Sequence, residues 1–439
     1  METNNKIDTE RAAVVGIITY DNPENEVNAS LDELERLLET AGGKALVRLV
    51  QAKESPDVRT FLGSGKIKEL AELCYSNEIT LVVCDSELSP SQIRNMEDAL
   101  DNGNPEKSIR VIDRSMLILD IFALHATSSE GKLQVELAQL KYTAPRLIGK
   151  GISMSRQQGG NIAMRGPGET KLESDRRHIK RRMHALEEEL AAVEQRRATQ
   201  RKQRDRSGIC RAAIVGYTNA GKSTLLNRLT DAGILAEDKL FATLDPTTRK
   251  FTLPEGTEVL LVDTVGFIRN LPHHLIKAFR STLDEAAYAD IVIMMTDASD
   301  PEASAQLEVT EKLISELGAG GKPTLCLFNK CDLDAENIPY APRTIPTENV
   351  FYISARTGRN IDDFVKRLEE LVNENTSHVT FKFPLDKQDS VARLYRFAKV
   401  ENVEYFENCV KVEAVCDGKA KGMFREWILK KDGEADEKL

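Results

Sequence analysis

The sequence predicts an α/β protein of more than one domain, and two patterns support that prediction. The chain has 439 residues, which suggests about three domains of ordinary size. Short apolar runs alternate with helix-like segments over residues 11–126 and again over 208–375, as expected where helices connect parallel strands. The runs in the second region are almost entirely apolar, as in strands buried on both faces. We therefore expect a parallel α/β domain in each region.

The first domain, residues 1–128, is predicted to hold four strands and at least two helices. The strand candidates are 12–19, 45–52, 79–85 and 109–113, and the helix candidates are 30–42 and 65–76. The first of these helices runs into Gly42 and Gly43, where a helix commonly ends. A small parallel sheet with helices on its faces follows from this order.

Residues 129–207 are predicted to form a long helical hairpin around a Gly-rich loop. Leu133, Leu137 and Leu140 repeat at helical spacing before the loop at 148–169. After the loop, the same spacing continues over the following residues: Ile179, Met183, Leu186, Leu190 and Val193. A narrow stripe of this kind is typical of two helices packed together. The alternative is a single helix packed on the neighbouring domain.

Charge and cysteine content narrow the class of protein. The net charge of −10 excludes a protein that coats nucleic acid over its whole surface, but residues 171–206 carry +5 and predict a local basic element. A solvated helix of mixed charge is the alternative. Seven cysteines without a CxxC pair favour neither a metal site nor a disulfide framework. No signal peptide and no membrane span are apparent, so we expect a cytoplasmic protein.

A phosphate-binding loop is predicted at residues 216–223, GYTNAGKS, which match GxxxxGK[ST] between a strand and a helix. Glycines let the backbone approach a phosphate closely, and the helix N-terminus favours negative charge. Lys222 is predicted to reach the β- and γ-phosphates, and the Ser223 hydroxyl to bind Mg²⁺.

Three further motifs follow later strands of the same region. DTVG at 263–266 offers Asp263 to Mg²⁺ and the Gly266 N–H to the γ-phosphate. NKCD at 329–332 offers Asp332 to the guanine ring N–H and amine, which adenine lacks. Ser354 and Ala355 follow the next strand, where a backbone N–H meets the guanine carbonyl. All four motifs fall at the carboxyl ends of strands, where open α/β sheets bind ligands. The sequence thus predicts a phosphate-loop GTPase domain over 208–375.

Two positions of this domain bear on hydrolysis. FATLDPTTRK at 241–250 holds the threonines that could close on Mg²⁺ and the γ-phosphate, and Thr243, Thr247 and Thr248 are all candidates. Phe267 follows DTVG, where Ras-like enzymes place a glutamine that orients water. Another group must therefore orient the water, or a partner must complete the site. Asn219 is a candidate ligand for K⁺, with a hydrogen bond that braces the loop as the favoured alternative.

The last region, residues 376–439, is predicted to be a small α+β domain. Its candidates are strands at 379–384 and 409–416 and a helix at 390–400.

The chain resembles the HflX family of translational GTPases. The resemblance rests on FATLDPT, DTVGFIRNLPHHL, FLGSGK at 61–66 and above all RGPGETKLESDRR, and it covers nearly the whole chain. It implies that Thr243 is the switch threonine on Mg²⁺, that 241–245 contact nucleotide, and that the hairpin and its loop reach the large ribosomal subunit. Some members split stalled or hibernating ribosomes, and some use ATP through the N-terminal domain.

GSGK at 63–66 lacks phosphate-loop spacing, so a structural turn before a helix is the favoured interpretation there.

These arguments assign four sets of site residues. Catalysis is assigned to Lys222, Thr243 and Gly266, and Mg²⁺ binding to Ser223, Thr243 and Asp263. Nucleotide contacts are expected from Gly216, Tyr217, Thr218, Asn219, Ala220, Gly221, Lys222, Ser223, Thr224, Phe241, Ala242, Thr243, Leu244, Asp245, Asp263, Thr264, Val265, Gly266, Asn329, Lys330, Cys331, Asp332, Ser354, Ala355 and Arg356. Contacts to rRNA phosphates are expected from Lys150, Arg156, Arg165, Lys171, Arg176 and Arg177.

The predicted function is a GTPase that associates with the large ribosomal subunit and its rRNA and splits ribosomes, and that is monomeric when free. The alternative is a nucleotide-gated binding or assembly factor whose hydrolysis is incidental. An RNA-remodelling ATPase is disfavoured by Asp332.

Overall fold

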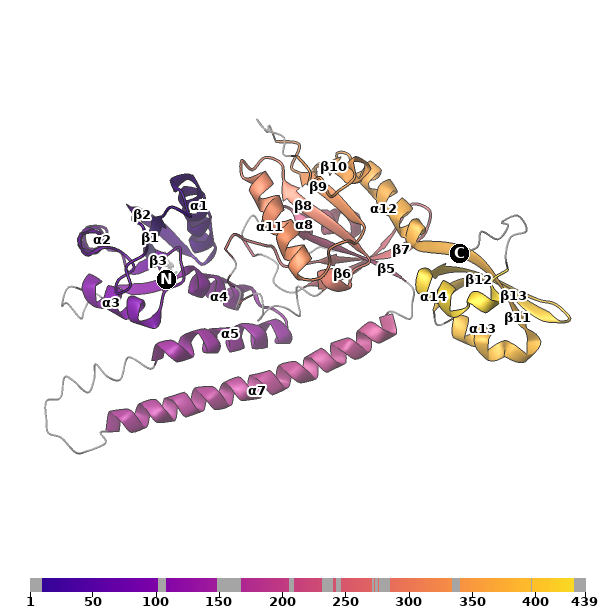
Figure 1. Ribbon diagram of the computed structural model, residues 1–439, viewed down its shortest axis with the longest axis horizontal. Helices are drawn as coiled ribbons and strands as arrows, with labels where there is room; N and C mark the ends of the chain where they lie inside the picture. Colours follow the sequence, from indigo (N-terminus) through magenta and orange to yellow (C-terminus); the bar gives the residue numbers. More distant parts are fainter. Residues whose placement is uncertain are drawn as a thin grey trace, which may run out of the picture. The chain divides into compact units, whose positions relative to one another are not determined.

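The computed structural model describes most of the chain, and within a few helical and strand positions it describes the backbone alone. The described residues are 10–101, 108–147, 167–204, 209–230, 240–241, 246–270, 272, 275, 285–333, 340–395 and 397–429. Two units divide the chain (Figure 1). The first comprises Met1–Ala191, Glu237–Asp245 and Val265–Thr282, and the second comprises Ala192–Ala236, Pro246–Thr264 and Leu283–Leu439.

A four-stranded parallel sheet in the order β2-β1-β3-β4 forms the centre of the first unit. Its strands are β1 Glu10–Ile18, β2 Gly43–Ala52, β3 Leu81–Cys84 and β4 Arg110–Asp113. The helices are α1 Glu24–Thr40, α2 Ser64–Ser76, α3 Pro90–Leu100 and α4 Arg114–His125. The predicted parallel α/β fold is confirmed. Helices α3 and α4 were not predicted. Ser89 starts α3 with a capping box to Gln92, which satisfies N–H groups that the first helical turn leaves without partners.

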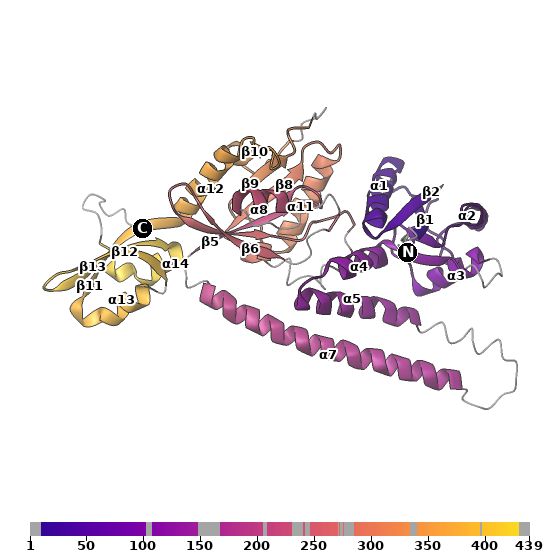
Figure 2. The same ribbon diagram turned by 180° about the vertical axis from the view of Figure 1, so that it is seen from behind.

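Helices α5 Ser129–Leu147 and α7 Pro167–Arg204 lie side by side in both views (Figures 1 and 2). Arg182 makes two hydrogen bonds of 2.7 Å to the Glu136 carboxylate, and Lys141 pairs with Glu187 at 2.8 Å. Leu186 of the predicted apolar stripe is fully buried, while the charged residues around it are exposed. The ion pairs Glu136–Arg182 and Lys141–Glu187 therefore join the two helices that the sequence predicted.

The second unit contains a six-stranded sheet in the order β10-β9-β8-β5-β7-β6. The strands are β5 Cys210–Gly216, β6 Thr247–Thr252, β7 Glu258–Asp263, β8 Ile291–Asp297, β9 Thr324–Asn329 and β10 Val350–Tyr352. All pairs are parallel except β6 with β7. The helices are α8 Lys222–Thr230, α11 Ala303–Glu316 and α12 Ile361–Asn375. The mixed α/β fold with a phosphate-binding loop is confirmed, and the edge strand β6 is an addition to the predicted elements.

A three-stranded antiparallel sheet in the order β11-β13-β12 ends the second unit. Its strands are β11 Thr376–Pro384, β12 Ala398–Tyr405 and β13 Cys409–Asp417, with the short helix α13 Gln388–Leu394 between the first two. The prediction of one helix over 390–400 was wrong at its end, because Ala398–Val400 pair with β13. Phe381, Phe383 and Phe424 fill the core of this part. None of the described helices combines the length and apolar composition needed to span a bilayer.

Candidate nucleotide-binding site

The phosphate-binding loop connects β5 to α8, and two of its glycines are required by geometry. Gly216 has φ +154°, and a Cβ there would lie 2.0 Å from the Met295 carbonyl oxygen. Gly221 has φ +93°, and its Cβ would lie 2.3 Å from Asn329 Nδ2. Side chains at either position would push the loop away from the strands beneath it. The backbone N–H groups that follow Gly221 open helix α8, which is the arrangement that favours a bound phosphate.

The Lys222 ammonium lies inside this loop. Its Nζ donates to the carbonyl oxygens of Gly216 at 3.1 Å and Tyr217 at 2.8 Å, and the residue is only 7% exposed. Burial lowers the pKa of Lys222 to about 8, and the charge of Asp263 offsets part of that effect. A buried ammonium held by two carbonyls can transfer its hydrogen bonds to phosphate oxygens.

Ser223 and Asp263 form the candidate Mg²⁺ site. Ser223 Oγ donates to Asp263 Oδ2 at 2.6 Å, and Asp263 is fully buried. Burial raises the pKa of the Asp263 carboxyl, against the opposing effects of Lys222 and Ser223. Asp263 Oδ1 is buried and has no hydrogen-bond partner among the described residues. A hydroxyl and a carboxylate suit Mg²⁺, which takes its other ligands from phosphate and water. In the part of the chain that the structure describes, no group of three or more His, Cys, Asp or Glu side chains is placed so that it could hold a metal ion.

Asn329 at the end of β9 connects two loops of the site. Its Nδ2 donates to the Ala220 carbonyl at 2.8 Å, and its Oδ1 accepts from the Ala355 N–H at 2.9 Å. The next residue, Lys330, has φ +63° and its Nζ pairs with Asp297 Oδ2 at 2.6 Å. These contacts fix the segment NKCD against both the phosphate-binding loop and the end of β8.

Asp332 points into solvent beside the loop that follows β10. Hydrogen bonding by the Ser354 side chain is the largest of several effects that lower the pKa of Asp332, so the group is a carboxylate at neutral pH. The Cys331 N–H donates to Ile353, and the Arg359 guanidinium donates to the Cys331 carbonyl. Asp332 is thus an exposed acceptor on a braced loop, which suits recognition of two adjacent N–H groups of a base.

The remaining predicted residues differ in their surroundings and in whether the structure describes them. Tyr217, Thr218 and Thr264 are buried in place, and Thr264 Oγ1 donates to the Ile214 carbonyl at 2.8 Å. Phe241, Val265 and Gly266 are described and belong to the first unit, whereas Thr247 and Thr248 begin strand β6. Outside the described residues lie Ala242, Thr243, Leu244, Asp245, Lys150, Arg156 and Arg165. Of Lys171 only the backbone is described, and Arg176 and Arg177 are exposed on α7.

Sequence reasoning missed two contributors to this site. Asp297 pairs with Lys330, and Arg228 of α8 donates to the carbonyls of Arg356 and Thr357 at 3.5 and 3.0 Å. Asp297 ends an apolar strand at the same sheet edge as the four motifs. That position in the sequence could have identified it as a residue of the site. Arg228 has no comparable signal, because only the folded helix brings it to the later loop.

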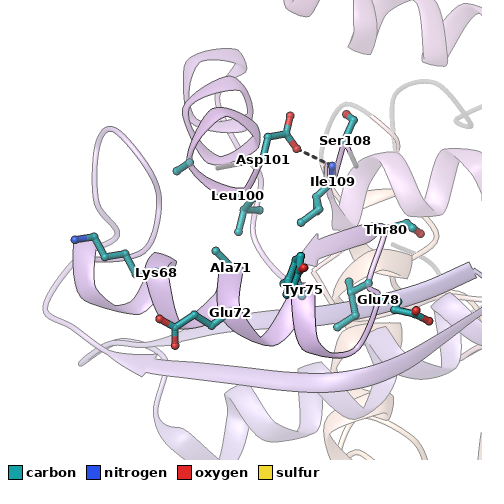
Figure 3. A pocket seen from close by; sticks show the side chains of 13 residues that line it. Lys68, Ala71, Glu72, Tyr75, Glu78, Thr80, Leu100, Asp101, Ser108 and Ile109 are labelled. Atoms are coloured by element: carbon teal, nitrogen blue, oxygen red, sulfur yellow. Dashed lines mark hydrogen bonds between the residues drawn. The ribbon is translucent and has the colours of Figure 1, made fainter. Parts of the chain in front are cut away.

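A separate hollow of about 920 Å³ opens on the first unit, between α2 and α3 (Figure 3). Its lining includes Lys68, Glu72, Tyr75, Leu100 and Ile109, and none of the residues 63–66. GSGK at 63–66 instead begins helix α2, and the Gly63 N–H donates to Gln51 Oε1 at 2.9 Å. This is the structural turn that the spacing favoured.

Three family descriptions match successive parts of the chain. "GTP-binding GTPase N-terminal" matches residues 28–123, "GTP-binding GTPase Middle Region" matches 125–204, and "50S ribosome-binding GTPase" matches 211–330. GTPase HflX of Lacrimispora saccharolytica is 46% identical over 405 residues, which are 92% of this chain and 93% of that protein. GTPase HflX of Escherichia coli is 40% identical over 84% of this chain and 85% of its own length. A GTP-binding protein of Sulfolobus solfataricus, solved with GDP, is 27% identical over 83% of this chain and 99% of that chain, with a TM-score of 0.42.

Proposed function

This chain belongs to the HflX family of GTPases, and from that premise we propose that it couples GTP binding and hydrolysis to association with the large ribosomal subunit. The resemblance inferred from its motifs is confirmed by relatives at 40–46% identity over most of the chain. It is an enzyme that binds GTP and hydrolyses it to GDP and phosphate. Splitting of stalled or hibernating ribosomes is the cellular outcome that we propose.

The observation that supports the nucleotide chemistry is the buried set of Lys222, Ser223 and Asp263. We propose that Lys222 transfers its hydrogen bonds from the Gly216 and Tyr217 carbonyls to the β- and γ-phosphates. Ser223 and Asp263 would hold Mg²⁺, which neutralises charge on the phosphates. The orphaned Asp263 Oδ1 supports this role, because a buried carboxylate oxygen without a partner is costly unless a ligand satisfies it.

Selection of guanine is proposed for Asp332, with the Ala355 N–H, which donates to Asn329 Oδ1 in the structure, transferring its hydrogen bond to the guanine carbonyl. The lowered pKa of Asp332 keeps it a double acceptor. Adenine would leave that carboxylate facing groups that cannot donate to it, so it should be rejected strongly. Asp332→Asn should remove most of the preference for GTP over ATP.

The ribosomal proposal rests on family membership and on the match of residues 211–330 to a 50S ribosome-binding GTPase. The basic residues Arg176 and Arg177 are exposed near the start of α7, close in sequence to the Gly-rich loop. We propose that they contact rRNA phosphates, as polyanions attract such side chains. Lys150, Arg156, Arg165 and Lys171 are proposed for the same role.

The deciding experiment is GTP turnover with and without purified large ribosomal subunits at fixed salt. Stimulation of at least about tenfold is expected, because assembly on a partner can complete a catalytic site. Unchanged turnover, together with no co-sedimentation in the presence of a nonhydrolysable GTP analogue, would remove the ribosomal assignment and leave the GTPase intact.

Phe267 favours a second candidate, a nucleotide-gated binding factor whose hydrolysis is incidental. The side chain is 1% exposed, so the position after DTVG presents no polar group to a water molecule. Either the ribosome supplies that group or hydrolysis has little part in the function. Repeated rounds of activity with a nonhydrolysable analogue would support the second candidate.

A monovalent cation is a further proposal at Asn219, which has φ +61° within the phosphate-binding loop. A side-chain oxygen held there could add a K⁺ ligand beside the phosphates. Turnover in KCl should then exceed turnover in NaCl, and equal rates would end the proposal.

A further inference from the structure

Helix α4 contacts two segments that come from the GTPase sequence. Glu237–Asp245 and Val265–Thr282 contain FATLD and the end of DTVG, yet both belong to the same compact unit as α4. In the described part of these segments, Phe241, Phe267, Ile268 and Leu275 are each at most 2% exposed. Phe267, Ile268 and Leu275 are therefore packed into the first unit.

The first contact joins Phe122 of α4 to Phe241. Their ring centroids lie 4.7 Å apart with the rings nearly perpendicular, at 84°. Phe241 has φ +57°, a backbone conformation that residues with side chains rarely adopt. Such a residue keeps that conformation only where its surroundings hold it. The Phe122 ring is one of those surroundings.

The second contact joins Arg114, the first residue of α4, to the Arg269 backbone. Arg114 is 2% exposed, and its Nη2 donates to the Arg269 carbonyl at 3.3 Å. The same guanidinium donates to Asp85 Oδ1 at 2.7 Å and pairs with Glu33. A planar guanidinium fixed by two carboxylates offers its remaining N–H in a set direction. The position of Arg269 is thus tied to helix α4 by a buried, oriented donor.

The residue before Arg114 is bound by the last turns of α5. Asp113 is fully buried and its Oδ2 accepts from the Tyr142 hydroxyl, from Arg146 Nη2 at 3.3 Å and from the Leu88 N–H at 3.0 Å. Asp113 Oδ1 caps α4 by accepting from the Met116 N–H. A displacement of the end of α5 would therefore move Asp113 and, through the adjacent backbone, Arg114.

We propose that Arg114 is a positioning residue for GTP hydrolysis, and that Asp113 and Arg114 relay the position of helix α5 to the segment after DTVG. The inference concerns intrinsic turnover, so it goes beyond the proposed ribosomal function and does not require it. The relay consists of Tyr142, Asp113, Arg114 and the Arg269 carbonyl.

The relay should affect GTP and GDP differently. The α- and β-phosphates and the base are assigned to the phosphate-binding loop, Asn329 and Asp332, none of which the relay touches. The γ-phosphate is assigned to the Gly266 N–H, three residues before Arg269. Loosening Arg269 should therefore misplace a γ-phosphate donor and leave GDP binding intact, and small misplacements of such donors reduce turnover steeply.

The test is Arg114→Lys in the full chain, which keeps the charge but lacks the guanidinium fork. We expect intrinsic kcat and affinity for a nonhydrolysable GTP analogue each to fall about tenfold, with GDP affinity changed less than about twofold. Arg48→Lys is the matched control, because Arg48 also pairs with two carboxylates, Asp32 and Glu35, and makes no contact with the described residues of either segment. Unchanged or increased kcat in Arg114→Lys would overturn the proposal.

Two further variants keep the proposal testable if Arg114→Lys fails to fold. Phe122→Leu removes the ring contact with Phe241. It should likewise lower the affinity for the GTP analogue and leave the affinity for GDP nearly unchanged. Tyr142→Phe removes the hydroxyl donor to Asp113, and it should lower kcat by a smaller factor. A double-mutant cycle combines Tyr142→Phe with Arg114→Lys. If the two residues are coupled, the fall in kcat of the double variant differs from the product of the falls in the two single variants. Fully multiplicative factors would contradict the relay, and equal losses of GDP and GTP-analogue affinity would indicate general unfolding of the site.

Discussion

Lys222 shows how burial prepares one side chain for its ligand. Without nucleotide, the Lys222 ammonium has exchanged water for two backbone carbonyls, and its pKa is lowered to about 8 from an ordinary 10.5. Between these values only the unfolded chain keeps the proton on this lysine, so its contribution to the free energy of unfolding rises with pH in that window. A polyphosphate supplies the negative charge that the loop lacks, and binding should draw a proton back onto Lys222.

Nucleotide affinity should therefore weaken as pH rises through about 8. Above that pH, the dissociation constant for GDP should increase by about tenfold per pH unit, because the charged lysine must first be restored. Fluorescence titrations at pH 7 to 9, below the ionisation of guanine itself, would measure this. Lys222→Met should bind weakly with little pH dependence, and an equally steep pH dependence in that variant would show that another group is responsible.

Residues of the nucleotide site were predictable where the motif dictates chemistry. Lys222, Ser223, Asp263 and Asn329 lie together as their motifs imply, because strand ends bring distant motifs to one sheet edge. The partner of Lys330 was not predictable in the same way. Asp297 meets it only once β8 and β9 pair in register.

The phosphate-binding loop is the element in which conformation and packing are most tightly linked. Gly221 combines φ +93° with a backbone that passes directly over Asn329. Gly221→Ala should displace the Asn329 amide, break its bond to Ala220, and destabilise the protein by about 1–3 kcal/mol. GDP affinity should fall by at least about tenfold, since 1.4 kcal/mol corresponds to that factor.

Calorimetry of GDP binding and thermal unfolding of the same sample would separate the two effects. Gly256→Ala provides the control, because Gly256 also has a positive φ of +88° but nothing lies within 4 Å of its Cβ position. An equal loss of GDP affinity in both variants would show that strain alone, and not the contact with Asn329, weakens the site.

Helix α4 and strand β12 show why some elements could not be predicted from the sequence. Helix α4 is buried on most of its circumference, with Leu117, Ile118, Leu119, Ile121 and Phe122 all in the core. Such a helix shows no polar face, so hydrophobic spacing gives no signal. Strand β12 was mistaken for the end of a helix because its assignment depends on pairing with β13, which sequence spacing does not reveal.

Helix α7 should carry an electrostatic contribution to ribosome association. Arg176 and Arg177 are exposed on the same helix that bears the Glu136–Arg182 contact to α5. Replacing both by glutamate should weaken co-sedimentation with large subunits and reduce the salt dependence of binding by about one unit of slope per lost phosphate contact. Lys382→Glu, an exposed change in the C-terminal sheet, should leave both quantities unaltered. An unchanged salt slope in the double variant would place the rRNA contacts elsewhere.

At the scale of the whole molecule, the nucleotide motifs are divided between the two units. The phosphate-binding loop, Asp263, Asn329 and Asp332 belong to the second unit, whereas Val265–Thr282 belongs to the first. A γ-phosphate, for which Lys222 and Gly266 are the proposed partners, would add contacts that GDP cannot make. GDP lacks that group, so the two nucleotides differ in the contacts that can shift a conformational equilibrium.

That difference predicts the nucleotide dependence of ribosome association and separates the two candidate functions. The complex with a nonhydrolysable GTP analogue should bind large subunits at least about a hundredfold more tightly than the GDP complex, a ratio that moves a two-state equilibrium from about 1:10 to about 10:1. If hydrolysis permits release, the analogue should support one round of ribosome splitting and then stop, while GTP supports many. Light scattering with intact ribosomes in excess over protein would count the rounds. Continued turnover with the analogue would establish a binding factor whose hydrolysis is incidental, and equal affinity of the GDP and analogue complexes would contradict a nucleotide switch of either kind.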